Sequence, residues 1–189
     1  MARPKEFEPE EALDKAMQTF WSKGYHDTSI RDLVARTGVN YYGLYGEFDS
    51  KHGLFLAALD RYRETVTAGI LQELEKPGPA RRVIEGAFDH LLARLKTPDG
   101  RVGCLVCNAA VELAPHDAEV AAKVRAHMKL LRNAFRAKLA EGQKGKDRGE
   151  LGAKAEFLAT TTYSLGVLAR FGCKDDYLRR HVRTALLAL

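Results

Sequence analysis

Residues 28–48 read TSIRDLVARTGVNYYGLYGEF and contain two short helical patterns on either side of a glycine. The first pattern places Ile30, Leu33 and Val34 on one buried side of a helix, and Thr37-Gly38-Val39 breaks it. Two short helices joined by a glycine-containing turn form a helix-turn-helix, whose second helix enters the major groove of DNA. The pattern therefore predicts a unit that can read a DNA duplex.

The second helix is expected to be very short, with Asn40 as its N-cap and with Leu44 and Phe48 as its apolar anchors. Residues four apart lie on the same face of a helix, so both anchors face the core. At 100° per residue, Tyr42 and Gly46 then point away from that core. These outward positions are the ones that would face the groove.

The start of each helix carries groups that suit the DNA backbone. Thr28 is expected to cap the first helix, and together with Ser29 and the backbone N–H groups there it suits phosphate oxygens. Lys51, one residue after a Ser50 cap, suits them too. The side chains expected to reach base edges are Arg31, Tyr41 and Tyr42. The alternative is that the tyrosines of this segment only pack or decorate a small helical unit.

Helical periodicity continues through the rest of the chain, and no segment alternates as a half-buried strand does. The fold class is therefore expected to be all-α, with about nine helices in two units. Residues 1–50 would form a three-helix DNA-binding domain, and residues 51–189 a helical domain for effector binding and dimerisation. A long helix from about residue 50 to residue 76 connects them, and residues 142–149 form a Gly- and Lys-rich loop.

Composition supports a folded chain without locating its site. Hydrophobic residues make up 46% of the 189 residues and charged residues 29%, which excludes wholesale disorder. No long apolar segment is present, so we expect no membrane partner and a cytoplasmic location. The formal charge of +5 invites nucleic acid, but the predicted DNA-binding part is itself slightly acidic. Arg3 and Lys5 are either a DNA-contacting arm or a solvated tail.

The first 51 residues resemble the tetracycline-repressor (TetR) family. The resemblance rests on the run from Thr28 to Ala35, on Thr37-Gly38-Val39, on Leu44-Tyr45 and Phe48, and on Ser50-Lys51. It implies a homodimeric bacterial transcriptional regulator, usually a repressor, that binds a double-stranded DNA operator and responds to a ligand in its C-terminal unit. The DNA-contacting residues that it implies are Thr28, Ser29, Arg31, Asn40, Tyr41, Tyr42, Gly43, Tyr45 and Lys51.

Cys104 and Cys107 stand three residues apart near an expected helix start, where unpaired N–H groups favour a thiolate. Their segment resembles a branch of the same family in which some members respond to electrophiles or oxidants. The alternative is that each cysteine is a small apolar filler. A disulfide between them would staple one helical turn, whereas a bulky adduct, or pairing with Cys173, could move whole helices. One Cys-X-X-Cys lacks the second ligand pair of a zinc site, so no metal and no cofactor are expected.

The expected effector pocket lies among the helices of the second unit, with Tyr62, Asn108 and Tyr163 as polar groups that would orient a ligand. A homodimer is expected through the last two helices. Their dimer-forming faces would be a stripe of small residues and an apolar row, namely Ala155, Ala159, Thr162, Gly166 and Ala169 with Leu186 and Leu189. The alternative for this stripe is packing within one chain.

An enzyme is the competing class of function. A helical thiol-disulfide oxidoreductase would use Cys104 as its nucleophile and Cys107 as its resolving thiol. No βαβ pattern surrounds the pair, and neither a Ser-His-Asp arrangement nor a phosphate-binding glycine loop occurs elsewhere. The sequence therefore favours a non-enzymatic regulator with no catalytic residues.

Overall fold

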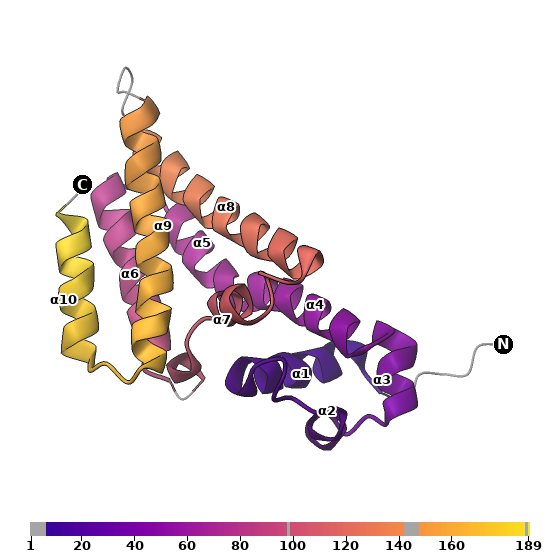
Figure 1. The fold of residues 1–189 in the computed structure, drawn as a ribbon. Coiled ribbons are helices and arrows are strands. Elements are labelled where there is room, and N and C mark those ends of the chain that lie inside the picture. Colours follow the sequence, from indigo (N-terminus) through magenta and orange to yellow (C-terminus); the bar gives the residue numbers. More distant parts are fainter. Residues whose placement is uncertain (1–6, 98, 142–147, 188) are drawn as a thin grey trace.

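A computed structural model describes residues 7–97, 99–141, 148–187 and 189. The expectations for Arg3 and Lys5 and for the lysines of the 142–149 loop lie outside these residues. Every regular element in the described part is helical, as predicted (Figure 1). The elements are α1 Pro9–Lys23, α2 Ile30–Thr37, α3 Tyr41–Phe48, α4 Lys51–Tyr62, η1 Arg63–Thr67, α5 Ala68–Glu75, α6 Ala80–Leu95, η2 Gly100–Val102, α7 Leu105–Glu112, α8 Ala118–Ala140, α9 Arg148–Arg170 and α10 Asp175–Leu186.

A first apolar core holds α1 to α4 together. Its largest fully buried side chains include Phe20 of α1, Leu33 of α2, Leu44 of α3 and Phe55 of α4. The rings of Phe20 and Phe55 meet edge to face with centroids 5.0 Å apart, a favoured aromatic geometry. Full burial of each such side chain stabilises the fold by about 2 kcal/mol. Partly buried side chains, among them Ile30 and Val34 of α2 and Phe48 of α3, add to this packing.

The cap of α2 differs from the prediction. Ser29, not Thr28, is the N-cap, and its hydroxyl accepts a hydrogen bond from the backbone N–H of Asp32 at 3.1 Å. The carboxylate of Asp32 in turn accepts one from the backbone N–H of Ser29 at 2.8 Å, which completes a capping box. Thr28 is fully buried, and its hydroxyl donates to the carbonyl of Gly24 at 2.6 Å. Its predicted cap role is therefore wrong.

The long helix expected from about residue 50 to residue 76 runs through α4, η1 and α5 without a break in the chain direction. Its middle turn, Arg63–Thr67, is a π-helix. The N-terminal half packs on α1 in the first core, whereas Ile70 and Leu74 of α5 belong to a second core with α6, α8, α9 and α10. The two cores thus meet along a continuous helix, and Figure 1 shows it crossing the molecule.

The small-residue stripe of α9 faces inward, contrary to the dimer role expected for it. Ala155 is fully buried and Ala159 and Ala169 are 3% and 1% exposed, all within the second core. The apolar row of α10 also faces inward, since Leu178, Val182 and Leu186 are buried in that core. The alternative of packing within one chain is the correct interpretation of both faces. None of the described helices is long and apolar enough to cross a lipid bilayer.

Short α7 lies between the two cores and contacts α1, α4, α8 and α9. Just before it, the carbonyl of Gly103 accepts a hydrogen bond from the indole N–H of Trp21 at 3.2 Å. The guanidinium of Arg170, at the end of α9, donates to the carbonyls of Trp21 and Val102. Gly103 adopts φ +88°, a conformation that L side chains rarely adopt. The start of α7 is therefore fixed against both the first core and the second core.

Candidate functional site

The outward face of α3 is open to solvent. Leu44 is fully buried, whereas Tyr42 is 84% exposed, Tyr41 is 47% exposed and Gly46 is also exposed. This is the arrangement expected from the spacing of Leu44 and Phe48. An α-helix with its side chains is about 10–12 Å in diameter and fits the major groove of B-DNA, which is about 12 Å wide.

The start of α3 is shaped by Asn40 and Gly43. The side-chain oxygen of Asn40 accepts a hydrogen bond from the backbone N–H of Gly43 at 2.9 Å, so Asn40 is the N-cap as predicted. A Cβ on Gly43 would come within 2.8 Å of the side chain of Val39 and 3.2 Å of Phe7. Nothing lies within 4 Å of a Cβ added at Gly46. Gly43 is therefore required for packing, and Gly46 leaves the outer face flat.

The other residues predicted to contact DNA lie around this face and differ in their exposure to solvent. Ser29 and Arg31 are exposed. The ammonium of Lys51 lies 4.3 Å from the ring centroid of Tyr25, and partial burial lowers its pKa. Tyr45 is half-buried, with its ring centroid 4.3 Å from that of Tyr41. Thr28 has no exposed surface for a phosphate and instead fixes the turn before α2.

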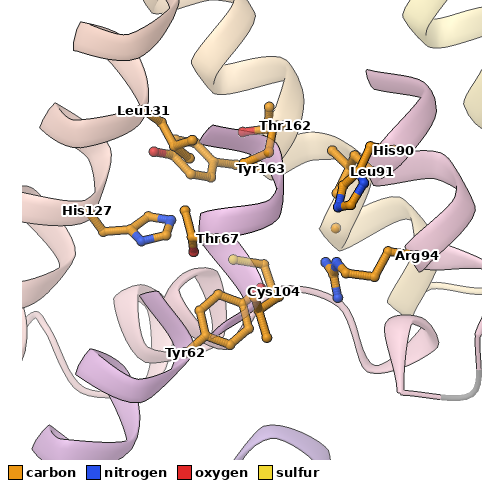
Figure 2. A pocket seen from close by; sticks show the side chains of 13 residues that line it. Tyr62, Thr67, His90, Leu91, Arg94, Cys104, His127, Leu131, Thr162 and Tyr163 are labelled. Carbon is orange, nitrogen blue, oxygen red and sulfur yellow. The ribbon is translucent and has the colours of Figure 1, made fainter. Parts of the chain in front are cut away.

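A small cavity separates α4 and α5 from α6, α8 and α9. Its volume is about 40 Å³, and its wall is mostly apolar. Tyr62, Cys104 and Tyr163 line it, so three of the predicted effector residues share one site. Figure 2 shows the Cys104 sulfur above the ring of Tyr62, with the guanidinium of Arg94 to its right. His127 and Tyr163 face this space from the opposite wall (Figure 2).

Cys104 is the N-cap of α7 and is 8% exposed. Its pKa is lowered to about 6, chiefly because the Cys107 thiol donates a hydrogen bond to its sulfur, and further because the Cys107 backbone N–H and the Tyr62 hydroxyl do so. Burial acts in the opposite direction and is outweighed. A thiolate is the nucleophilic form of cysteine, so Cys104 is the acidic thiol of the pair.

The other predicted effector residues lie outside this cavity. Cys107 is not among its lining residues, and its pKa is raised because its proton is shared with Cys104 and because it is largely buried. Asn108 is not a lining residue either, and its side-chain nitrogen is buried without a hydrogen-bond partner. Cys173 is half-buried beyond α9. Sequence analysis missed Arg94 and His127, because neither belongs to a recognisable motif.

The oxidoreductase alternative gains no support from this geometry. Cys104 is almost completely buried, and Cys107, its proposed resolving partner, has a raised pKa. A buried pair at a helix start between two cores offers little access to a protein disulfide substrate.

The short α2, the turn at Gly38 and the exposed tyrosine face of α3 define a DNA-binding protein of the helix-turn-helix class. The family described as "Bacterial regulatory proteins, tetR family" matches residues 12–58. The description "Tetracyclin repressor-like, C-terminal domain" matches residues 78–186. The chain belongs to the tetR family of bacterial transcriptional regulators.

Full-length relatives support this assignment. The chain is 33% identical to the uncharacterised HTH-type transcriptional regulator YezE of Bacillus subtilis (strain 168), over 100% of both proteins. It is 32% identical to the HTH-type transcriptional repressor ComR of Escherichia coli (strain K12), over 97% of this chain and 90% of ComR. A cysteine mutant of the TetR family regulator CifR, complexed with a 26-base-pair double-strand operator, is a solved structure of the same fold. It has 28% identity, a TM-score of 0.89 and coverage of 98% of this chain and 99% of CifR.

Proposed function

We propose that this protein is a cytoplasmic homodimeric repressor that binds a palindromic DNA operator through two copies of α3. The observation that carries the proposal is the exposure of Tyr41 and Tyr42 on a helix whose opposite side is anchored by fully buried Leu44. Exposed aromatic rings at a groove-sized helix favour contacts with base edges. ComR carries the name of a repressor, and the CifR structure contains operator DNA, which is consistent with the same role here.

Within this proposal, Arg31, Tyr41 and Tyr42 contact bases, and the flanking polar groups hold the phosphates. Ser29 and the start of α2 offer a hydroxyl and backbone N–H groups to one strand. Lys51 contacts a phosphate by leaving the face of Tyr25, above which it lies. Asn40, Gly43 and Tyr45 act near the backbone, where Asn40 and Gly43 also set the direction of α3. Thr28 has a supporting role, because it is buried behind α2.

The proposed dimer uses the outer faces of α9 and α10. Large apolar side chains are exposed there, with Val167 56%, Phe171 85% and Tyr177 46% exposed. Phe157 on the same helix α9 is 49% exposed. Such residues cluster where a protein binds a partner, and two antiparallel helices from each chain would form a four-helix interface. This face is opposite to the small-residue stripe, which is already packed.

Release from DNA is proposed to follow from events at the Cys104 cavity. Either a small ligand or modification of the acidic Cys104 thiolate by an electrophile would displace the start of α7. The cavity has a volume of only about 40 Å³, so an adduct on Cys104 cannot be accommodated without movement of a helix. The end of α7 contacts the DNA-binding unit and would carry that movement to α2 and α3.

Footprinting on the DNA that flanks the protein's own gene tests this proposal. We expect two protected half-sites related by a two-fold axis, with centres about one helical turn apart or a multiple of it. Light scattering of the free protein should give the mass of two chains, near twice 21.0 kDa. A monomer in solution together with no protected site in that DNA would refute the proposal.

A further inference from the structure

Two buried polar atoms at the cavity have no partner in the described structure. They are Nδ1 of His127, on α8, and the hydroxyl of Tyr163, on α9. His127 is only 4% exposed, and both residues line the same cavity. Leaving a buried polar atom unpaired costs about 1–3 kcal/mol, so such atoms are rare unless something else satisfies them. A ligand in that cavity with a hydrogen-bonding oxygen would satisfy them.

His127 does not supply a positive charge at this end of the cavity. Burial lowers its pKa to about 4, with a further contribution from the charge of Arg63. The unpaired Nδ1 of a neutral imidazole either donates or accepts, and a phenol hydroxyl does both, so the two atoms can pair with a neutral group such as a hydroxyl or carbonyl. The left wall of the cavity in Figure 2 is therefore built for an uncharged oxygen.

The opposite wall carries a guanidinium beside the acidic thiol of Cys104. The guanidinium of Arg94, near the end of α6, lines the cavity, and within the described residues no carboxylate pairs with it. It lies instead over the ring of Trp21, 5.4 Å from the ring centroid. His90, one turn earlier on α6, lines the same side. An unpaired guanidinium at the edge of an apolar cavity suits a carboxylate, which it binds with two parallel hydrogen bonds.

We propose that the cavity binds a short-chain hydroxy or keto carboxylic acid. Its carboxylate would lie on Arg94, and its hydroxyl or keto group on His127 and Tyr163. The apolar wall between them, which includes Ile70 and Leu131, takes the carbon chain. About 10–15 Å³ of this kind of volume holds one water, so the cavity of about 40 Å³ has room for about three and must widen to admit a hydroxy acid. The inference deepens the proposed function, because this acid is the ligand whose binding would shift α7.

The single tryptophan of the chain is a built-in reporter for this site. Because the Arg94 guanidinium lies over Trp21, an anion that draws it away changes the indole fluorescence. Lactate, 3-hydroxybutyrate and 4-hydroxybutyrate serve as the probes, because they differ in the distance between the hydroxyl and the carboxylate. We expect saturable fluorescence changes with at least one of them. Butyrate lacks the hydroxyl group and 3-hydroxybutyramide lacks the negative charge, so both should bind at least tenfold more weakly than the best hydroxy acid.

Variants separate the two ends of the ligand. Arg94→Gln should lower the affinity for the best hydroxy acid about tenfold to a hundredfold, whereas Arg82→Gln, exposed on the same helix, should leave it unchanged. Tyr163→Phe should also weaken binding, but it should not lower the midpoint of thermal unfolding, because it removes an unpaired hydroxyl. Isothermal titration calorimetry repeats the measurement for Arg94→Gln without relying on the indole signal.

The outcomes for the ligand and for DNA are independent. If none of the three hydroxy acids binds, or if binding ignores both Arg94→Gln and Tyr163→Phe, the ligand inference is wrong even when operator binding is observed. If a hydroxy acid binds as described while the operator footprint is absent, the proposed regulator function fails and the ligand site stands. Binding that weakens the operator complex supports both.

Discussion

The carboxylate of Glu112 accepts a hydrogen bond from the backbone N–H of His26 at 2.7 Å, across 86 residues of sequence. The same carboxylate accepts one from the backbone N–H of Tyr25 at 3.0 Å. Glu112 is the last residue of α7, and Cys104 is the N-cap of that helix. One rigid helix therefore joins the cavity wall to the turn that precedes α2. Displacement at Cys104 has a direct route to the DNA-reading helices.

Removing this link should uncouple the two units. In the parent protein, alkylation by N-ethylmaleimide is expected to weaken operator binding. In Glu112→Ala the alkylation should lose at least half of its effect on the logarithm of the operator dissociation constant, because α7 no longer holds the 25–26 turn. Fluorescence anisotropy with labelled operator measures both states. Glu119→Ala, exposed at the start of α8, is the control, and an equal alkylation effect in all three proteins would contradict the route.

The thiolate of Cys104 should form at unusually low pH. We expect the rate of its alkylation by iodoacetamide, followed by mass spectrometry, to rise with a midpoint near pH 6 rather than near pH 9. Cys107→Ala should move that midpoint upward, because the main hydrogen bond to the Cys104 sulfur is lost, and Cys173→Ser should not move it. A parent midpoint near pH 9 would show that Cys104 is an ordinary buried thiol.

His127 should make the fold sensitive to acid. Its folded-state pKa of about 4 lies below the usual 6.5, so the unfolded chain takes up a proton first as the pH falls. The stability is complete above about pH 6.5 and is lost progressively toward pH 4. Between pH 7 and pH 5 this group should cost about 2 kcal/mol of the free energy of unfolding. In urea titrations His127→Leu should lack that loss and His116→Leu, at an exposed position, should keep it.

The outer face of α9 should decide the oligomeric state. Val167→Arg places a charge on a side chain that is 56% exposed in one chain, so it should change the unfolding midpoint little. It should nevertheless convert the dimer to a monomer in light scattering, because the charge would be buried at the interface. Val111→Arg, at an 83% exposed position on α7, should remain dimeric. A dimeric Val167→Arg protein would place the interface elsewhere.

Local signals made the DNA-binding unit predictable from sequence. Leu44 and Phe48 fix which side of α3 faces the core, so the exposure of Tyr42 follows from helix geometry. The cap of α2 was assigned one residue too early, although Ser29 and Asp32 already form the sequence pattern of a capping box. A preference for a cap position does not say which of two neighbouring hydroxyls turns toward the helix.

Features that depend on contacts between distant helices are harder to predict from the sequence. The stripe from Ala155 to Ala169 correctly indicated a close helix approach, but sequence spacing does not distinguish a neighbour within the chain from a second copy. Arg94 and His127 come from α6 and α8 and acquire meaning only because the fold places them on opposite walls of one cavity. That Nδ1 of His127 is unpaired depends on how the helices pack, so it cannot be predicted from the residue type.

The most direct test of the central claim is the affinity of an Arg31→Ala/Tyr42→Ala double variant for the footprinted operator, measured by fluorescence anisotropy. Both side chains are exposed, so the double variant should fold and dimerise like the parent. Each lost base contact is expected to cost about 1–3 kcal/mol, which predicts a loss of affinity of roughly thirtyfold or more. Arg82→Ala should bind like the parent. A folded, dimeric double variant that also binds the operator as tightly as the parent would contradict the assignment of α3 as the reading helix.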